Sequence, residues 1–214
     1  MRRQAFVPIA LIAAFALWAG PSVLAQWRPG GQQRIVLLVD SSTAVAPMIT
    51  SFRAGLKDFL DTLPGDPEIA IITTGGQFRN RVGPTTDRDK LVAAASMFAS
   101  DGGANSFLDT MIEADRRLLK SAPERRPVFV ILTTDAGEMV GEVNIETYNR
   151  FAGDFLKRGG RAHALVVRGV RTGVTTRIAE NLAQNTGGYY ETAGLASAVP
   201  KLMKTMAEYV AADQ

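Results

Sequence analysis

Short apolar runs alternate with longer amphipathic segments along most of the chain. Residues 34–40 (RIVLLVD) and 127–135 (PVFVILTTD) are continuous apolar runs, which are typical of strands that are buried on both faces of a sheet. Further strands are predicted at 68–74, 161–168 and 189–192. Helical spacing and end signals predict helices at 47–63, 87–99, 106–119, 145–157, 175–184 and 195–211.

The order of these elements predicts an α/β fold. Strands that alternate with helices form a doubly wound, mostly parallel sheet with helices on both faces. Residues 78–82 alternate apolar and charged positions after a Gly-Gly turn, so they are expected to pair antiparallel with 68–74 as a sixth strand at the edge. No internal repeat or linker interrupts residues 34–214, and we expect one domain there.

The first 25 residues differ from the rest. Arg2 and Arg3 precede an apolar run at 6–18, and Ala25 closes a small-residue cleavage pattern. This pattern predicts a signal peptide at 1–25, followed by a flexible lead-in at 26–33. The 13-residue run is short for a membrane anchor, which needs about 20 residues. We therefore expect an exported protein, periplasmic or secreted, with no transmembrane anchor after cleavage.

Composition narrows the function classes. Hydrophobic residues make up 46% and charged residues 21% of the chain, which argues against disorder. The predicted signal peptide holds two arginines and no acids, so its removal lowers the net charge from +3 to +1. That charge gives no support for nucleic-acid binding. The chain has no cysteine, so its stability cannot rest on disulfides.

Two predicted strands end in aspartate, at Asp40 and Asp135. In a doubly wound sheet the first strand and the strand that follows the return of the chain are neighbours, so these carboxylates are expected to converge. Ser42 and Asn105 lie in loops expected at the same edge. Carboxylate, hydroxyl and amide oxygens suit Mg²⁺, Mn²⁺ or Ca²⁺ and do not suit zinc.

Three segments together resemble a known family. VDSSTA (39–44), GGANSFLD (102–109) and ILTTDAGE (131–138) are similar, in order and spacing, to the von Willebrand factor type A (vWA) domain. The family's metal-ion-dependent adhesion site combines Asp-x-Ser-x-Ser, a distant Thr and a distant Asp. The resemblance implies a Rossmann-like fold and a metal site formed by Asp40, Ser42, Asn105 and Asp135.

The site departs from the family pattern at two ligand positions. Ala44 stands where the second Ser would ligate, and Asn105 stands where the family has Thr. Two interpretations follow: a Mg²⁺-type site that keeps several waters, or a degenerate site with weak or no intrinsic metal binding. The same residues also have structural interpretations. The two aspartates would cap turns, and Asn105 would cap the helix that follows it.

The resemblance implies a protein-binding module rather than an enzyme. In the family, a protein partner often contributes an acidic side chain that completes the coordination of the ion. A metal-independent scaffold of an envelope complex is the alternative, and a hydrolase is a third class. The chain has no Gly-x-Ser-x-Gly elbow and no phosphate-binding loop, and its one histidine, His163, falls inside a predicted strand.

Overall fold

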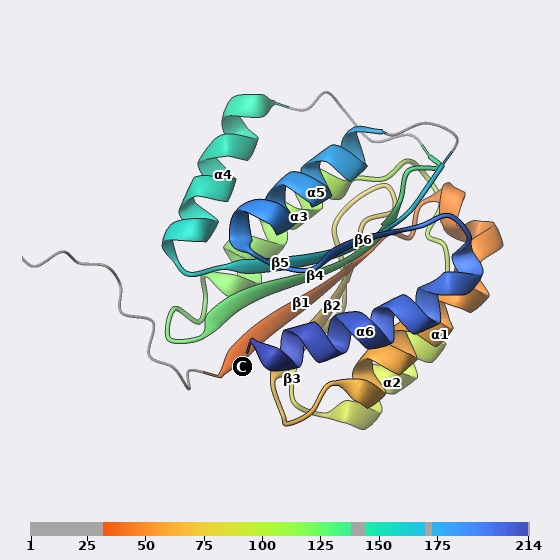
Figure 1. Cartoon of the computed structure of the whole chain (residues 1–214), viewed down its shortest axis with the longest axis horizontal. Coiled ribbons are helices and arrows are strands. Elements are labelled where there is room, and N and C mark those ends of the chain that lie inside the picture. The colour runs from red at the N-terminus through yellow and green to blue at the C-terminus, as the bar shows by residue number, and fades with distance from the viewer. Residues whose placement is uncertain (1–31, 138–143, 170–172, 214) are drawn as a thin grey trace, which may run out of the picture.

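A six-stranded sheet forms the centre of the molecule (Figure 1). The computed structural model describes residues 32–137, 144–169 and 173–213. The predicted signal peptide and most of the lead-in lie outside them. The strands are β1 (Gln33–Val39), β2 (Glu68–Thr73), β3 (Arg79–Thr85), β4 (Arg126–Thr134), β5 (Arg161–Val167) and β6 (Tyr190–Ala193).

The strand order is β3-β2-β1-β4-β5-β6. Every neighbouring pair is parallel except β2 and β3, which confirms the predicted antiparallel edge strand. This strand runs to Thr85 rather than Val82 and includes Pro84, which an edge position tolerates because one side has no ladder partner. Val39 lies opposite Leu132, so β1 and β4 end side by side at the centre of the sheet.

Helices cover both faces of the sheet, as predicted. They are α1 (Ile49–Thr62), α2 (Arg88–Ser96), α3 (Phe107–Ala114), α4 (Ile145–Lys157), α5 (Val174–Thr186) and α6 (Val199–Ala212). Alternate residues of β1 point to opposite faces. Ile35 and Leu37 pack with α1, α2 and α6, while Val36 and Leu38 pack with α3, α4 and α5. Figure 1 shows these two helical layers on either side of the sheet.

Some helix ends differ from the prediction. The chain after β1 forms a 3₁₀ turn, η1 (Thr43–Met48), before α1 begins. The predicted helix 106–119 ends its α-helical part at Ala114 and continues as a π-helical turn, η2 (Asp115–Leu119). Asp87 caps the N-terminus of α2, because its carboxylate accepts the Lys90 N–H at 3.0 Å.

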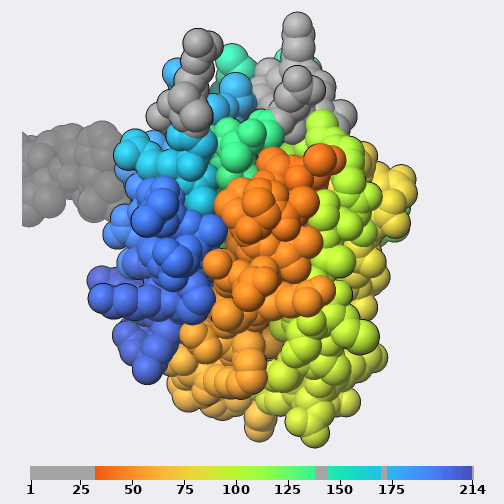
Figure 2. Space-filling model, turned by 90° about the vertical axis from the view of Figure 1, so that its right-hand side faces the viewer, coloured from red at the N-terminus to blue at the C-terminus, as the bar shows by residue number. Residues whose placement is uncertain are grey.

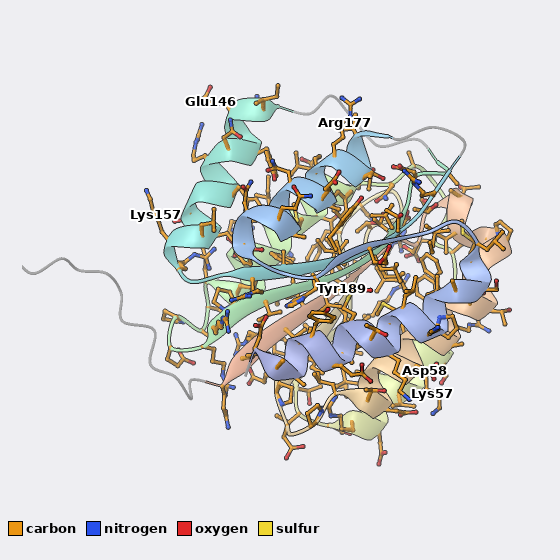
Figure 3. The ribbon with its side chains drawn as sticks, in the orientation of Figure 1. Lys57, Asp58, Glu146, Lys157, Arg177 and Tyr189 are labelled. Carbon is orange, nitrogen blue, oxygen red and sulfur yellow. The ribbon has the colours of Figure 1, made fainter. Side chains whose placement is uncertain are left out.

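The C-terminal edge of the sheet is the face seen in Figure 2. There the orange segment after β1 meets the yellow-green segment that precedes α3 and the green segment after β4. The outer sides of the helices are charged: Lys57 and Asp58 of α1, Glu146 and Lys157 of α4 and Arg177 of α5 point outward (Figure 3). Within the described ranges, no helix is long and apolar enough to cross a membrane.

Candidate functional site

Asp40 lies at the end of β1 and is only 1% exposed. Its N–H donates to the Leu132 carbonyl at 2.9 Å, which continues the pairing with β4 by one residue. Its Oδ1 accepts the Ser42 N–H at 2.8 Å and closes a tight turn. The predicted turn-capping role of Asp40 is therefore present, and it uses only one of the two carboxylate oxygens.

The second oxygen of Asp40 receives three donors. Asn105 Nδ2 lies at 2.8 Å, and the Thr133 hydroxyl and the Thr134 N–H each lie at 3.3 Å from Oδ2. None of these groups carries a charge. Burial raises the pKa of Asp40, and the hydrogen bonds from Ser42, Thr133 and Thr134 oppose that rise only in part.

Asn105 lies in the site because the backbone of its loop pairs with the segment that follows β2. Asn105 pairs with Gly75 in an isolated β-bridge, and the Ser106 N–H donates to the Thr74 carbonyl at 2.8 Å. Its Oδ1 accepts the Thr74 hydroxyl at 2.6 Å, and its Nδ2 also reaches the Thr133 hydroxyl at 3.1 Å. The predicted helix-capping role is wrong, because the N-cap of α3 is Ser106. The Asn105 amide is hydrogen-bonded to the strand residues instead.

Asp135 makes different contacts. Its carboxylate accepts the Gly173 N–H at 3.0 Å, the Thr176 N–H at 3.3 Å and the Thr176 hydroxyl. These donors belong to the N-terminus of α5, which attracts negative charge. Among the described residues, Asp135 shares no hydrogen-bond partner with Asp40, so the two carboxylates lie in separate networks at the same edge.

Ser42 has a buried hydroxyl that makes no hydrogen bond of standard geometry among the described residues, although it lies close enough to the Asp40 carboxylate to lower the pKa of Asp40. It is 1% exposed and lines a pocket of about 370 Å³. The other lining residues are small or short: Thr43, Ala44, Gly103, Ala104, Ala136 and Gly137. A Cβ on Gly137 would lie 2.7 Å from the Ala44 methyl, so glycine permits the close approach of these two loops.

Ser41 faces away from the pocket and ties the loop to its neighbour. Its hydroxyl donates to Asp101 at 2.7 Å and accepts the Gly75 N–H at 2.9 Å. Asp101 also pairs with Arg81, and these bonds lower the pKa of Asp101 although burial opposes them. This second network orients the loop that carries Asn105.

The four predicted ligands do not fit a resident divalent cation in this arrangement. Both Asp40 oxygens are occupied by hydrogen-bond donors, and Asn105 presents its NH₂ group, which cannot ligate, to Asp40. Asp135 is turned to α5, and Ala44 offers a methyl group. Ser42 Oγ alone is free. The part of the chain that the structure describes holds no group of three or more His, Cys, Asp or Glu residues suited to a metal.

Several residues of the site were not predicted from the sequence. Thr133 and Thr134 hold Asp40, Thr74 holds Asn105, and Thr176 holds Asp135. The hydroxyl pair before Asp135 was visible as part of ILTTDAGE, and it directly follows Leu132, the last β4 residue that pairs with β1. Thr74 and Thr176 carried no comparable local signal.

Residues 35–138 match the sequence model of the von Willebrand factor type A domain. This match, over just under half of the chain, confirms the predicted resemblance to the vWA domain family. The six-stranded sheet, with five parallel strands and one antiparallel edge strand, agrees with that resemblance. Domains of this family commonly act as protein-interaction modules. A comparison with curated protein sequences finds no significant match.

Solved structures share the fold at low sequence identity. A von Willebrand factor type A protein from Catenulispora acidiphila has a TM-score of 0.68 at 14% identity, and the match covers 83% of this chain and 42% of that one. An aerotolerance-related membrane protein from Bacteroides fragilis has a TM-score of 0.59 at 12% identity, with 82% and 98% covered. The matched part of this chain thus spans less than half of the first protein and nearly all of the second.

A third similar structure bears on the choice of ion. Proximal thread matrix protein 1 from the mussel byssus, with a zinc-occupied adhesion motif, has a TM-score of 0.66 at 13% identity, covering 84% of this chain and 48% of that one. Zinc therefore occupies the motif in that protein, although oxygen ligands alone led us to exclude it. Any test for an ion in this chain must include zinc.

Proposed function

We propose that this protein is an exported protein-binding module that recognises its partner at the C-terminal edge of the sheet. One observation carries the proposal. The Ser42 hydroxyl is buried and makes no hydrogen bond of standard geometry among the described residues, and Ser42 lines a pocket of about 370 Å³ at that edge. Buried polar groups are nearly always hydrogen-bonded, so such a group calls for an external partner.

The walls of the pocket suit a protein ligand. Gly103 and Gly137 lack side chains, and Ala44, Ala104 and Ala136 present only methyl groups. A partner's loop can therefore approach the backbone of this edge closely. The Ser42 hydroxyl donates one hydrogen bond and accepts others, so it would fix the position of a polar group at the tip of that loop.

The proposal is one of binding rather than catalysis. His163 is the only histidine in the sequence, and it lies inside β5 at 1% exposure. Its Nδ1 accepts the Tyr189 N–H at 3.1 Å, so the ring is fixed within the sheet and is not at the pocket. The structural role of His163 supports a non-enzymatic function. Binding of Mg²⁺, Mn²⁺ or Ca²⁺ at Asp40, Ser42, Asn105 and Asp135 is an untested prediction from the sequence, and the hydrogen bonds of these side chains do not favour it.

Site-specific photocrosslinking tests the binding edge. A photoreactive amino acid is placed at Ala136, which is exposed and lines the pocket, and in a matched protein at Ala212, which is exposed at the end of α6. We expect a discrete crosslinked partner from position 136. In pull-downs with protein that carries no photoreactive residue, Ala136→Arg should abolish retention of that partner, whereas Ala212→Arg should leave it unchanged. Crosslinking from position 212 alone would contradict the proposal.

Export is tested separately, on the protein purified from its natural source. Cleavage after Ala25 gives a chain that begins at Gln26, and intact-mass measurement with N-terminal sequencing detects it. A protein that keeps Arg2 and Arg3 in a cytoplasmic fraction would contradict export. This result would leave the binding edge untouched.

A further inference from the structure

We propose that the Asn105 amide takes the place of a resident divalent cation in this domain. Asn105 links Asp40, Thr133 and Thr74 by hydrogen bonds that need no ion, so the C-terminal edge is assembled in the absence of metal. The consequence for the partner rests on the proposed function: recognition there requires neither a metal ion nor a carboxylate from the partner.

The orientation of the Asn105 amide follows from chemistry. A carboxylate only accepts hydrogen bonds, and the atom of Asn105 that lies 2.8 Å from Asp40 Oδ2 must therefore be the NH₂ nitrogen. The opposite atom accepts the Thr74 hydroxyl at 2.6 Å. A flipped amide would place two oxygens against each other, so the surrounding groups select one orientation.

The amide is also held firmly in place. Asn105 is 3% exposed, and its backbone forms the β-bridge to Gly75. The adjacent Gly76 N–H donates to the Ala104 carbonyl at 2.8 Å, and the Ser106 N–H donates to the Thr74 carbonyl. An ion that bound to Asp40 would have to displace a side chain that the sheet holds on both sides.

A divalent ion would find few other ligands. Asp40 Oδ1 is occupied by the Ser42 N–H, and the Asp135 carboxylate is occupied by donors from α5. Ala44 replaces the second serine of the family motif with a methyl group. The Ser42 hydroxyl remains, and a single neutral oxygen does not hold a hard cation against water.

Asparagine and aspartate have nearly the same shape, which gives a sharp test. Asn105→Asp places a second carboxylate against Asp40 Oδ2 and removes the neutral donor that now stabilises it. Two carboxylates at this distance cannot both stay ionised without a cation between them. We therefore expect this substitution to convert a metal-independent site into a metal-dependent one.

The experiment measures the melting temperature of the full chain, in EDTA and then in titrations with Mg²⁺, Mn²⁺, Ca²⁺ and Zn²⁺. Wild type should show no saturable shift with any ion. Asn105→Asp should melt lower than wild type in EDTA and should recover by roughly 5–10 °C when an ion reaches 100 times its Kd. Asn185→Asp is the control: the same change on the exposed end of α5 should give no ion response.

Two outcomes would overturn the proposal. One is a saturable rise in the wild-type melting temperature that Asp40→Ala removes, because the wild-type site would then hold an ion. The other is an Asn105→Asp protein that responds to ions no more than Asn185→Asp. If Asn105→Asp does not fold, the double variant Asn105→Thr with Ala44→Ser, which restores the family ligands, is titrated instead, with the same expectation.

These measurements use purified protein and ions alone, so they are independent of the partner. A metal-binding wild type would overturn the role of Asn105 and leave the binding edge intact. Loss of crosslinking from position 136 would overturn the binding edge and leave the role of Asn105 intact.

Discussion

Among the described residues, two aspartates are almost completely buried, and the protein stabilises them in different ways. Asp40 is 1% exposed and Asp115 is 2% exposed, and burial raises the pKa of both carboxyls. Asp115 is met by cations: Arg158 Nη2 lies 2.7 and 2.8 Å from its two oxygens, and Lys120 lies at 3.8 Å. Within the described part of the chain, Asp40 is met only by neutral donors.

The difference separates a structural site from a candidate binding site. A buried carboxylate with an ion-pair partner has its charge compensated within the fold. A carboxylate held by dipoles alone keeps a net charge at the edge of the sheet, and its geometry depends on each donor being in place. Asn105 is the closest side-chain donor to Asp40. Its removal should therefore destabilise the buried Asp40 carboxylate, as removal of Arg158 should destabilise that of Asp115.

Removal of Arg158 is expected to have the largest effect. Arg158→Met leaves the Asp115 carboxylate buried with only the distant Lys120, and breaking such a pair should lower the free energy of unfolding by about 3 kcal/mol. Urea denaturation at pH 7 measures this loss. Arg150→Met is the control: its pair with Glu146 is exposed, and we expect a change within about 0.5 kcal/mol. If Arg158→Met and Arg150→Met lowered the free energy of unfolding equally, Arg158 would not compensate the charge of Asp115, and the contrast with Asp40 would fail.

Removal of the Asn105 amide should cost less. Asn105→Ala takes the closest donor from Asp40 and the acceptor from Thr74, and we expect a loss of about 2 kcal/mol in the free energy of unfolding. Denaturation in EDTA and in Mg²⁺ should give the same value. Asn185→Ala, on the exposed end of α5, should change stability by less than about 0.5 kcal/mol. A loss no larger than that of the control would show that Asp40 does not depend on Asn105.

A third buried group, His163, is expected to destabilise the fold in acid. Burial, with the charges of Arg161 and Arg126, lowers the pKa of His163 to about 3. The unfolded histidine titrates near 6.5, so the unfolded chain binds more protons between these values and stability falls as the pH drops below about 6.5. Between pH 7 and pH 5 this group alone should remove about 2 kcal/mol.

His163→Gln isolates this contribution. Urea denaturation of both proteins at pH 7 and pH 5 should show a smaller loss of stability in the variant, whatever its stability at pH 7. The acid responses of Asp40 and Asp115 can then be compared in that background. If both proteins lost the same free energy between the two pH values, His163 would not be the group that drives the acid response.

The sequence predicted the sheet well because its signals are local. Apolar runs that end in Asp40 and Asp135 locate the two central strands, and their order gives the switch point where they meet. The family motif added the position of Asn105. The start of β4 was less visible, because Arg126 looks like part of a charged turn, yet it is 8% exposed and donates to the Gly159 and Asp213 carbonyls.

The contacts of the site could not be predicted in the same way. Whether Asn105 ligates an ion, caps a helix or holds Asp40 depends on one side-chain orientation, which Thr74 and Thr133 select from distant strands. The turn of Asp135 towards α5 depends on where residues 173–176 lie, and nothing near Asp135 in the sequence encodes that placement. Local patterns gave the positions of these residues, whereas their hydrogen bonds depend on the tertiary structure.

The smallest expected effect tests whether the neutral donors of Asp40 act as a unit. The Thr133 hydroxyl donates to Asp40 at 3.3 Å and accepts from Asn105 at 3.1 Å, so Thr133→Val should lower the free energy of unfolding by about 1 kcal/mol. Thr192→Val on β6 is the control, with a change within about 0.5 kcal/mol. In the Asn105→Ala background the Thr133→Val loss should shrink, because the two residues share one Asp40 oxygen and their effects are coupled. Strict additivity in this double-mutant cycle would mean that Asp40 is held by independent bonds rather than by a network.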